Sequence, residues 1–190
     1  MVREIRTQRM VLRPLAEPDR AEFIRVRTVS ADLFRPWFPA REKSLEETFD
    51  DELAKSRQED RHLRLVGEMP DGRLAGFFNL GEIVRGVFQN AYASWSVSAE
   101  AAGQGYGTEG VGALLDLAFS ERGLGLHRVQ ANIIPRNERS LRLAERVGMR
   151  REGIALRYLR IDGAWQDHVM YAKTAEEHEL LYLKADEVEV

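Results

Sequence analysis

The sequence predicts a single α+β domain in which a mixed, strongly twisted sheet of about seven strands is flanked by helices. Three consecutive β-prone runs within residues 62–97 indicate an antiparallel meander. A glycine-dense turn then leads into an amphipathic helix and a further strand, which adds a strand–helix–strand unit to the meander. With 190 residues, 44% hydrophobic and 31% charged, the chain has the composition of one ordinary globular domain.

Composition excludes several classes of function. No apolar run approaches the ~20 residues of a membrane span, and the N-terminal segment lacks the apolar core of a signal peptide, so we expect a cytoplasmic protein with no membrane partner. The absence of cysteine excludes disulfides, thiolate metal sites and a cysteine-bound acyl intermediate. The formal net charge of −3 argues against direct nucleic-acid binding, and four scattered histidines give no metal-ligand spacing, so no metal is expected.

The first forty residues combine a strand, a helix and an irregular segment. Residues 10–15 alternate apolar and polar side chains, as in a strand, and Pro18-Asp19 introduces an apparent helix. Residues 33–39 (LFRPWFP) hold two prolines among three aromatic residues, which indicates an irregular segment. This segment is either a loop packed on the core or a lid that contacts substrate.

A highly charged helix follows. Ser44 and Glu47 form a capping box, and we expect the helix to extend to about Arg61. Its acidic excess indicates a solvated surface, with weak attraction for a cationic partner as the alternative. The meander strands are then expected at 62–69, 73–84 and 88–97, with a hairpin turn at Pro70-Asp71-Gly72.

The glycine turn has the layout of an anion-binding site. A strand ends at Val97, glycines stand at 103, 105 and 107, and a helix follows in which Val111, Leu114, Leu115 and Ala118 form one apolar stripe. The start of a helix offers unpaired N–H groups and a positive dipole end, and glycine lets a ligand approach the backbone. A phosphate or pyrophosphate is therefore the expected guest.

The remaining elements continue the alternation of strands and helices. We expect a strand at 126–134, a helix capped by Asn137 and ended by Gly148, and two strands at 149–160 and 164–173 joined by a turn at Asp162-Gly163. Beyond Thr174 the chain is acidic with some leucines, and either a docked helix or a frayed tail fits.

The glycine turn literally matches the dinucleotide fingerprint G-x-G-x-x-G over residues 105–110. Its context argues against that function. The motif follows an antiparallel meander, the strand at 126–134 has no acidic residue for a ribose hydroxyl, and no second βαβ half follows. Kinase and Walker motifs are absent from the sequence.

Residues 102–107 (AGQGYG) resemble the pyrophosphate loop Q/R-x-x-G-x-G/A of the GNAT acyltransferases, with Ala102 in place of the usual Gln or Arg. Asn137 and Ser140, followed by Gly148-Met149 and Glu152-Gly153, resemble the second element of that family. Segments 34–39, 79–88 and 158–169 further resemble the RimJ/RimL-like subgroup, the ribosomal-protein alanine N-acetyltransferases. The resemblance implies a GNAT N-acetyltransferase domain over residues 5–173 and an acidic C-terminal tail over 174–190.

The resemblance implies that acetyl-CoA is the co-substrate and lies in a notch where two parallel strands splay apart. Its pantetheine arm would pair with main chain near the end of the third meander strand, and its pyrophosphate with amides of the glycine turn. The implied cofactor contacts are Ser96, Val97, Ser98, Gly103, Gln104, Gly105, Tyr106, Gly107, Thr108 and Asn137. The Thr108 hydroxyl can also cap the helix, and Asn137 can combine capping with a CoA contact.

The catalytic groups are less evident. Many GNAT enzymes carry a tyrosine seven residues after the helix-leading Asn, where this chain has Ala144, so Ser140 is the candidate proton donor to the thiolate; the alternative is a hydroxyl bonded to a helix carbonyl. Glu82 is the candidate base, ahead of Glu100 and Glu109, whose positions have structural explanations, and water-relayed deprotonation is an equal alternative.

Other polar residues have simpler expected roles. We expect His127 and His168 to be packed or hydrogen-bonded strand residues rather than catalysts. Arg136, Arg139 and Arg142 form a basic group that is either solvated or in contact with the adenosine 3′-phosphate.

The leading hypothesis is transfer of acetyl to the N-terminal α-amine of a protein, such as a ribosomal protein, by direct attack in a ternary complex. An α-amino group has a pKa near ~8 and lysine near ~10.4, so an N-terminal acceptor needs less help to lose its proton. One alternative acceptor is a small amine, such as an antibiotic, polyamine or amino acid. Another alternative is a catalytically silent CoA-binding or ribosome-associated module. A different acyl-CoA, such as succinyl-CoA, and a homodimer both remain open.

Overall fold

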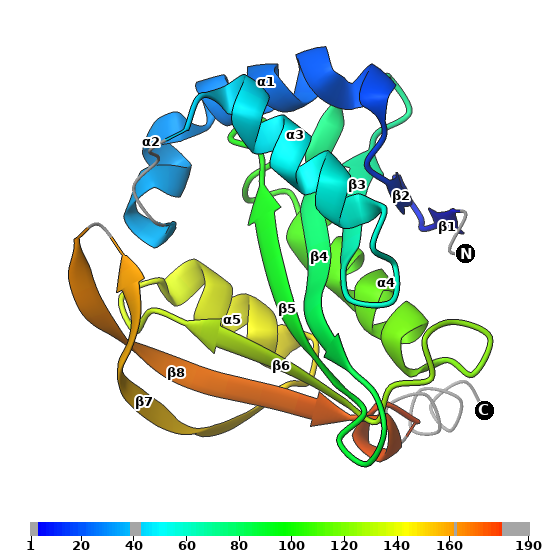
Figure 1. Cartoon of the computed structure of the whole chain (residues 1–190), viewed down its shortest axis with the longest axis vertical. Coiled ribbons are helices and arrows are strands. Elements are labelled where there is room, and N and C mark those ends of the chain that lie inside the picture. Colours follow the sequence, from blue (N-terminus) through cyan, green and yellow to red (C-terminus); the bar gives the residue numbers. More distant parts are fainter. Residues whose placement is uncertain (1–3, 39–42, 162, 180–190) are drawn as a thin grey trace.

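The computed structural model describes residues 4–38, 43–161 and 163–179 (Figure 1). Its strands form one mixed sheet in the order β1-β2-β3-β4-β5-β6-β8-β7, in which β5 and β6 run parallel and the other described neighbours are antiparallel. The strands are β1 (Ile5–Arg6), β2 (Val11–Pro14), β3 (Leu63–Glu68), β4 (Leu74–Val84), β5 (Asn90–Val97), β6 (Arg128–Ile133), β7 (Arg150–Ile161) and β8 (Ala164–Thr174). The predicted α+β class is confirmed, with β1 as a strand that the sequence did not indicate.

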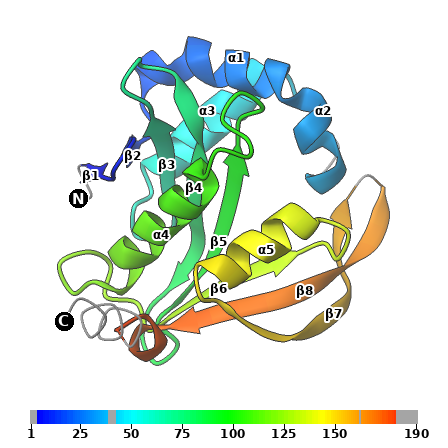
Figure 2. The same ribbon diagram turned by 180° about the vertical axis from the view of Figure 1, so that it is seen from behind.

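Helices cover both faces of the sheet. One face carries α1 (Arg20–Val29) and α3 (Leu45–Ser56), and the other carries α4 (Tyr106–Phe119) and α5 (Glu138–Arg146), which stand in front in Figure 2. Both core clusters follow this division: Phe78, Val111 and Leu114 pack on the α4 side, and Phe23, Phe49 and Phe77 on the α1 side. The predicted apolar stripe of α4 is confirmed, because all four of its residues are fully buried.

The aromatic segment at 33–39 is more regular than predicted. Leu33 and Phe34 end a short helix, α2 (Ala31–Phe34), and Arg35–Trp37 form a 3-10 turn whose middle residue is Pro36. Proline fixes its own φ near the helical value and lacks an N–H that the first turn does not need, so it fits there. Pro39 lies outside the described residues.

The charged helix is shorter than predicted. The Ser44 capping box is present, with Glu47 N donating to Ser44 Oγ at 3.1 Å and Ser44 N donating to Glu47 Oε2 at 2.8 Å. The helix ends at Ser56 rather than near Arg61, because a turn closed by Arg61 N donating to Gln58 O at 2.9 Å replaces its last residues.

The predicted hairpin turns lie between the expected strands. Gly72 adopts a φ of +83° and Gly163 a φ of +78°, backbone conformations that favour glycine. Asp162 lies outside the described residues. The described part of the C-terminal segment, residues 175–179, is helical, and His178 Nε2 lies 2.8 Å from Asp116 Oδ1 on α4, so this part is docked rather than frayed.

The two parallel strands separate after three residue pairs. Asn90, Ala91 and Tyr92 of β5 pair with residues 128–130 of β6, and no further pair joins these strands. Beyond that point β5 stays paired with β4 up to Val97, and β6 stays paired with β8 up to Ile133. The result is the splayed notch that the family resemblance implied. None of the helices in the described part of the chain is long and apolar enough to span a membrane.

Candidate active site

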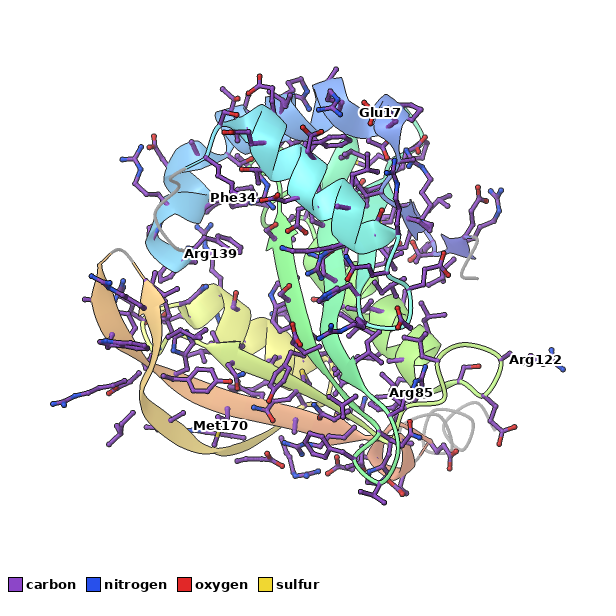
Figure 3. The ribbon with its side chains drawn as sticks, in the orientation of Figure 1. Glu17, Phe34, Arg85, Arg122, Arg139 and Met170 are labelled. Carbon is purple, nitrogen blue, oxygen red and sulfur yellow. The ribbon has the colours of Figure 1, made fainter. Side chains whose placement is uncertain are left out.

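A cavity of about 640 Å³ occupies the gap between β5 and β6. This volume is in the range of small-molecule sites. The cavity passes from one face of the sheet to the other: Ala131 and Ile133 belong to the core under α4 and α5, whereas Asn132 alternates to the opposite face. Figure 3 shows Phe34 of α2 and Arg139 of α5 on the same side of the molecule, and both line this cavity.

The glycine turn presents unpaired backbone amides to the cavity. Gly105 is the N-cap of α4 with a φ of +89°, and the first main-chain bond of the helix is Glu109 N to Gly105 O at 3.2 Å. The amides of the three residues between them therefore lack an intrahelical acceptor. At Gly107 a Cβ would lie 2.7 Å from Leu143 Cδ1 and 3.1 Å from Val97 Cγ2, so only glycine lets α4 start this close to α5 and β5.

Most of the predicted cofactor contacts line the cavity: Ser96, Val97, Gly103, Gly105, Gly107, Thr108 and Asn137. Three others do not line it. Ser98 is fully buried, and its amide donates to Ala75 O at 2.8 Å. The Gln104 side chain folds back to Glu100 O at 2.6 Å, and the Tyr106 ring lies 4.5 Å beneath the Arg9 guanidinium.

The start of α5 brings Ser140 to the cavity. Asn137 Oδ1 accepts from Ser140 N at 3.3 Å, which confirms the predicted cap. Ser140 lines the cavity, and its hydroxyl makes no hydrogen bond within residues 4–38, 43–161 and 163–179, in contrast to Thr28, whose hydroxyl bonds to Ile24 O. The back-bonded alternative for Ser140 is thus not what the structure adopts.

A row of arginines on α5 also faces the cavity. Arg139, Arg142 and Arg146 follow one another at helical spacing and all line it. Arg146 NH1 donates to Thr108 Oγ1 at 3.2 Å and so bridges α5 to the first turn of α4. This cationic row and the start of α4 give one face of the cavity a positive potential.

Glu82 is not at this site. It lies in an irregularity of β4 with a φ of +49°, its side chain is 63% exposed, and its nearest cation is Arg61 at 3.8 Å. Glu82, the first candidate for the base, is therefore exposed to solvent near the start of β5, away from the cavity. The bulge turns Glu82 away from the strand's regular alternation, which a linear pattern does not reveal.

Glu100 and Glu109 have the structural roles expected of them. A hydrogen bond from Arg25 holds the pKa of Glu100 below its ordinary value. Burial acts to raise the pKa of Glu109, but hydrogen bonds from Thr7 and Arg9 outweigh it and lower that pKa. Among the described residues that line the cavity, none is a carboxylate.

The opposite face of the cavity is aromatic and carries a histidine. Leu33, Phe34, Trp37 and Phe38 line it together with Asn132 and His168. His168 is 3% exposed, and its Nδ1 lies 3.0 Å from Gln166 O. Burial lowers the pKa of His168 below 6.5. The prediction of a packed strand residue is correct for the burial of His168 but omits its position in the cavity wall. For His127 the expected packing in a strand is wrong, because this residue precedes β6 and its side chain is 55% exposed.

A family model for the acetyltransferase (GNAT) domain matches residues 9–150. The chain belongs to the GNAT acetyltransferase family. Over 102 residues it is 40% identical to "Probable N-acetyltransferase YjcK" of Bacillus subtilis (54% of this chain, 55% of the relative). Over 106 residues it is 38% identical to "[Ribosomal protein uS5]-alanine N-acetyltransferase" of Escherichia coli (55% and 54%). These alignments thus span about half the length of each curated relative.

Solved structures are similar to this chain over most of its length. Mycobacterium smegmatis RimJ, in complex with CoA-disulfide, has a TM-score of 0.81 at 29% identity, covering 92% of this chain and 89% of that one. The Vibrio cholerae spermidine N-acetyltransferase, in complex with CoA and spermine, has a TM-score of 0.77 at 22% identity, covering 90% and 98%. The latter similarity supports the GNAT fold alone.

The sequence did not indicate that Arg9 supports the glycine turn. Its Nε and NH2 both lie 2.7 Å from Glu109 Oε2, and its NH1 donates to Gln104 O at 2.8 Å. Arg9 thereby ties the N-terminal segment to the glycine turn and to the first turn of α4. Because about one hundred residues separate the partners, no local pattern indicates this contact.

Proposed function

We propose that this protein is an acetyl-CoA-dependent N-acetyltransferase that acts on the N-terminal α-amine of a protein. The observation that carries the proposal is a cavity that crosses the sheet between β5 and β6, with unpaired amides and arginines on one face and an aromatic, histidine-containing pocket on the other. A ternary complex needs two ligands to meet from opposite sides, and this cavity has two differently built ends.

The cofactor end suits CoA in shape and charge. The amides at the start of α4, which has 14 residues, offer donors for a pyrophosphate, and Arg139, Arg142 and Arg146 offer cations for phosphates. The edges of β5 and β6 that face each other beyond Tyr92 lack strand partners, so they have main-chain groups for the amides of a pantetheine arm. Bound acetyl-CoA supplies an activated thioester.

The residues of this chain divide the remaining chemistry. Ser140, on the α5 side, is the proposed proton donor to the leaving sulfur, because it lines the cavity and its hydroxyl has no protein partner in the described residues. Ala144, where many GNAT enzymes carry tyrosine, is fully buried in the core, so Ser140 is the hydroxyl that this helix offers. The aromatic side chains of α2 and the turn after it exclude water from the acceptor end.

An N-terminal peptide suits the acceptor end better than a polyamine. The described residues that line the cavity include no carboxylate, so a polycation gains no ion pair there. A relative is named for ribosomal protein uS5 alanine, and a solved relative for spermidine, so both acceptor classes enter the test. We propose a ribosomal protein N-terminus as acceptor, which implies reaction in the cytoplasm, with residues 5–173 as the catalytic domain and 174–190 as its tail.

The test is thiol release from acetyl-CoA with a panel of acceptors: peptides beginning with Ala or Ser, the same peptides with blocked N-termini and an internal lysine, and spermidine. Unblocked peptides should react. Ser140→Ala should lower kcat about 10²-fold with little change in CoA affinity, whereas Ser120→Ala at the far end of α4 should leave both unchanged. Turnover of spermidine alone would show that the acceptor is a polyamine and not a protein N-terminus. CoA binding without any turnover would favour a binding module.

A further inference from the structure

His168 stands at the acceptor end of the cavity, where β8 continues past the end of β6. Its neighbour Val169 pairs with Ile133, the last residue of β6, and Met170 pairs with Asn132. Because strand residues two apart share a face, His168 lies on the same face as Asn132, opposite to the face under α4 and α5. His168 and Ser140 thus reach one cavity from opposite sides of the sheet.

The hydrogen bond to Gln166 determines which ring nitrogen of His168 is free. A main-chain carbonyl only accepts, so the 3.0 Å contact requires that Nδ1 carries the proton. The neutral ring then has its lone pair on Nε2. Gln166 is held in turn by Arg136, whose NH1 donates to Gln166 Oε1 at 3.0 Å. The ring orientation therefore follows from the main chain of β8 and a support from the segment before α5.

We propose that His168 Nε2 is the general base that removes the proton from the acceptor amine. This inference rests on the proposed function and names the group that the family resemblance left unassigned. Among the described residues that line the cavity, the other ionisable side chains are arginines, which have no lone pair to accept a proton. Glu82, the earlier candidate, lies outside the cavity.

The groups that face His168 keep it neutral and fixed. From β7, the Tyr158 ring packs against it at 5.5 Å between centroids and 61° between planes. Tyr158 Oη accepts from Asn132 Nδ2 on β6 at 3.1 Å. Burial, with a smaller contribution from Tyr92 on β5, raises the pKa of Tyr158, so the phenol stays neutral. The neighbouring Asp167 acts to raise the pKa of His168, but burial acts more strongly and lowers it.

The proton balance of this step is complete. Nε2 takes one proton from the incoming ammonium, whose nitrogen then attacks the thioester carbon; a C–N bond forms and the C–S bond breaks. Ser140 delivers a proton to the leaving sulfur, and the second proton that the nitrogen loses reprotonates the Ser140 hydroxyl. His168 returns its proton to solvent, so each turnover releases one proton together with CoA and the acetylated amine.

The first experiment reads the tautomer of His168 in the unmodified protein. Long-range ¹⁵N–¹H correlation spectra of ¹⁵N-histidine-labelled protein should show the Nδ1–H form at pH 7, with His168→Gln used to assign the signal. A neutral Nε2–H form, or a doubly protonated ring at pH 7, would overturn the proposal. This measurement does not depend on turnover.

The second experiment separates a chemical role from a structural one by its pH dependence. His168→Gln should lower kcat about 10²- to 10³-fold at pH 7, with CoA and peptide affinity nearly unchanged. Because an α-amine with a pKa near ~8 arrives neutral at higher pH, the defect should shrink to less than tenfold at pH 9.5. His127→Gln, at a histidine whose side chain is 55% exposed, is the matched control and should behave as wild type.

Chemical rescue covers the case in which His168→Gln folds poorly. His168→Ala should regain activity with added imidazole, and Tyr158→Phe, which keeps the packed ring, should retain most activity. A defect that is equal at all pH values, or absent, overturns the role of His168 while leaving the proposed function intact. A wild-type protein that acetylates no amine overturns the proposed function itself, whatever the tautomer.

Discussion

Replacing Arg9 with glutamine should loosen the glycine turn without touching the cavity. The guanidinium contacts Glu109 through Nε and NH2, the Gln104 carbonyl through NH1, and the face of the Tyr106 ring. These partners flank the amides at the start of α4. Glutamine removes the charge and the fork of donors, so the turn should lose its tether to the N-terminal segment.

The size of the effect follows from the contacts that disappear and those that stay. Hydrogen bonds to charged groups contribute about 1.5–3 kcal/mol each, but the Arg9 side chain is 41% exposed and water screens its ion pair. Glu109 also keeps the Thr7 hydroxyl and the amide of residue 9 as donors. We therefore expect a loss of about 2 kcal/mol in unfolding free energy, which for a chain of this size lowers Tm by roughly 4–8 °C.

Urea unfolding measures the loss of stability of Arg9→Gln, and calorimetric titration measures its affinity for CoA. The same variant should bind CoA about tenfold more weakly, because the turn is less preorganised. Arg6→Gln is the matched control: that side chain is 79% exposed and pairs with Glu4, so stability and CoA affinity should both stay near wild type. An Arg9→Gln protein within about 0.5 kcal/mol of wild type, with unchanged CoA affinity, would refute the reasoning.

The Arg9–Glu109 ion pair makes the free energy of unfolding depend on pH in a direction that can be stated. The pKa of Glu109 is held below its ordinary 4.5, so its ionised form stabilises the fold at higher pH, and this stabilisation is lost as pH falls through the folded-state pKa. Arg9→Gln weakens that stabilisation. The stability difference between wild type and variant should thus be largest near pH 7 and shrink below pH 4.5, which urea unfolding at several pH values measures.

Two further predictions concern α4 and its contact with α5. A Cβ at Gly110 would lie 2.3 Å from the ring of buried Phe78, so Gly110→Ala should destabilise by roughly 1–3 kcal/mol, whereas Gly112→Ala, with no atom within 4 Å, should stabilise by up to about 1 kcal/mol; denaturant unfolding compares them. Arg146→Gln, at the Thr108 contact, should weaken CoA binding about tenfold at low salt and less at high salt, as calorimetric titration measures.

Local patterns explain why most elements could be predicted. The stripe of α4, the Ser44 capping box and the turns at Gly72 and Gly163 depend on residues within one or two turns of each other, and all are confirmed. β1 could not be found in the same way. It is two residues long and forms only by pairing Ile5 and Arg6 with β2, a contact without a periodic signal.

The glycine turn and the Asn137 cap could be predicted from the sequence, whereas the aromatic, histidine-containing end of the cavity could not. The glycine turn and Asn137 carry motifs whose backbone requirements are local. His168 resembles any packed strand histidine until the sheet places it on the same face as Asn132, and Glu82 resembles a core strand residue until the irregularity in β4 exposes it. Which face a strand residue takes depends on register and bulges, and these are set by tertiary contacts.

The gap between β5 and β6 persists because each of these strands is held by its other neighbour in the sheet. Gly76 of β4 approaches β5 so closely that a Cβ there would lie 2.4 Å from Ser96 O, and pairing continues to Val97, so β5 cannot shift toward β6 without losing its ladder. β6 is held in the same way by β8 as far as Ile133. Beyond Tyr92, the main-chain groups on the facing edges need hydrogen-bond partners that neither strand supplies to the other. A ligand with amide groups can supply them, and under the proposed function the pantetheine arm of acetyl-CoA is that ligand.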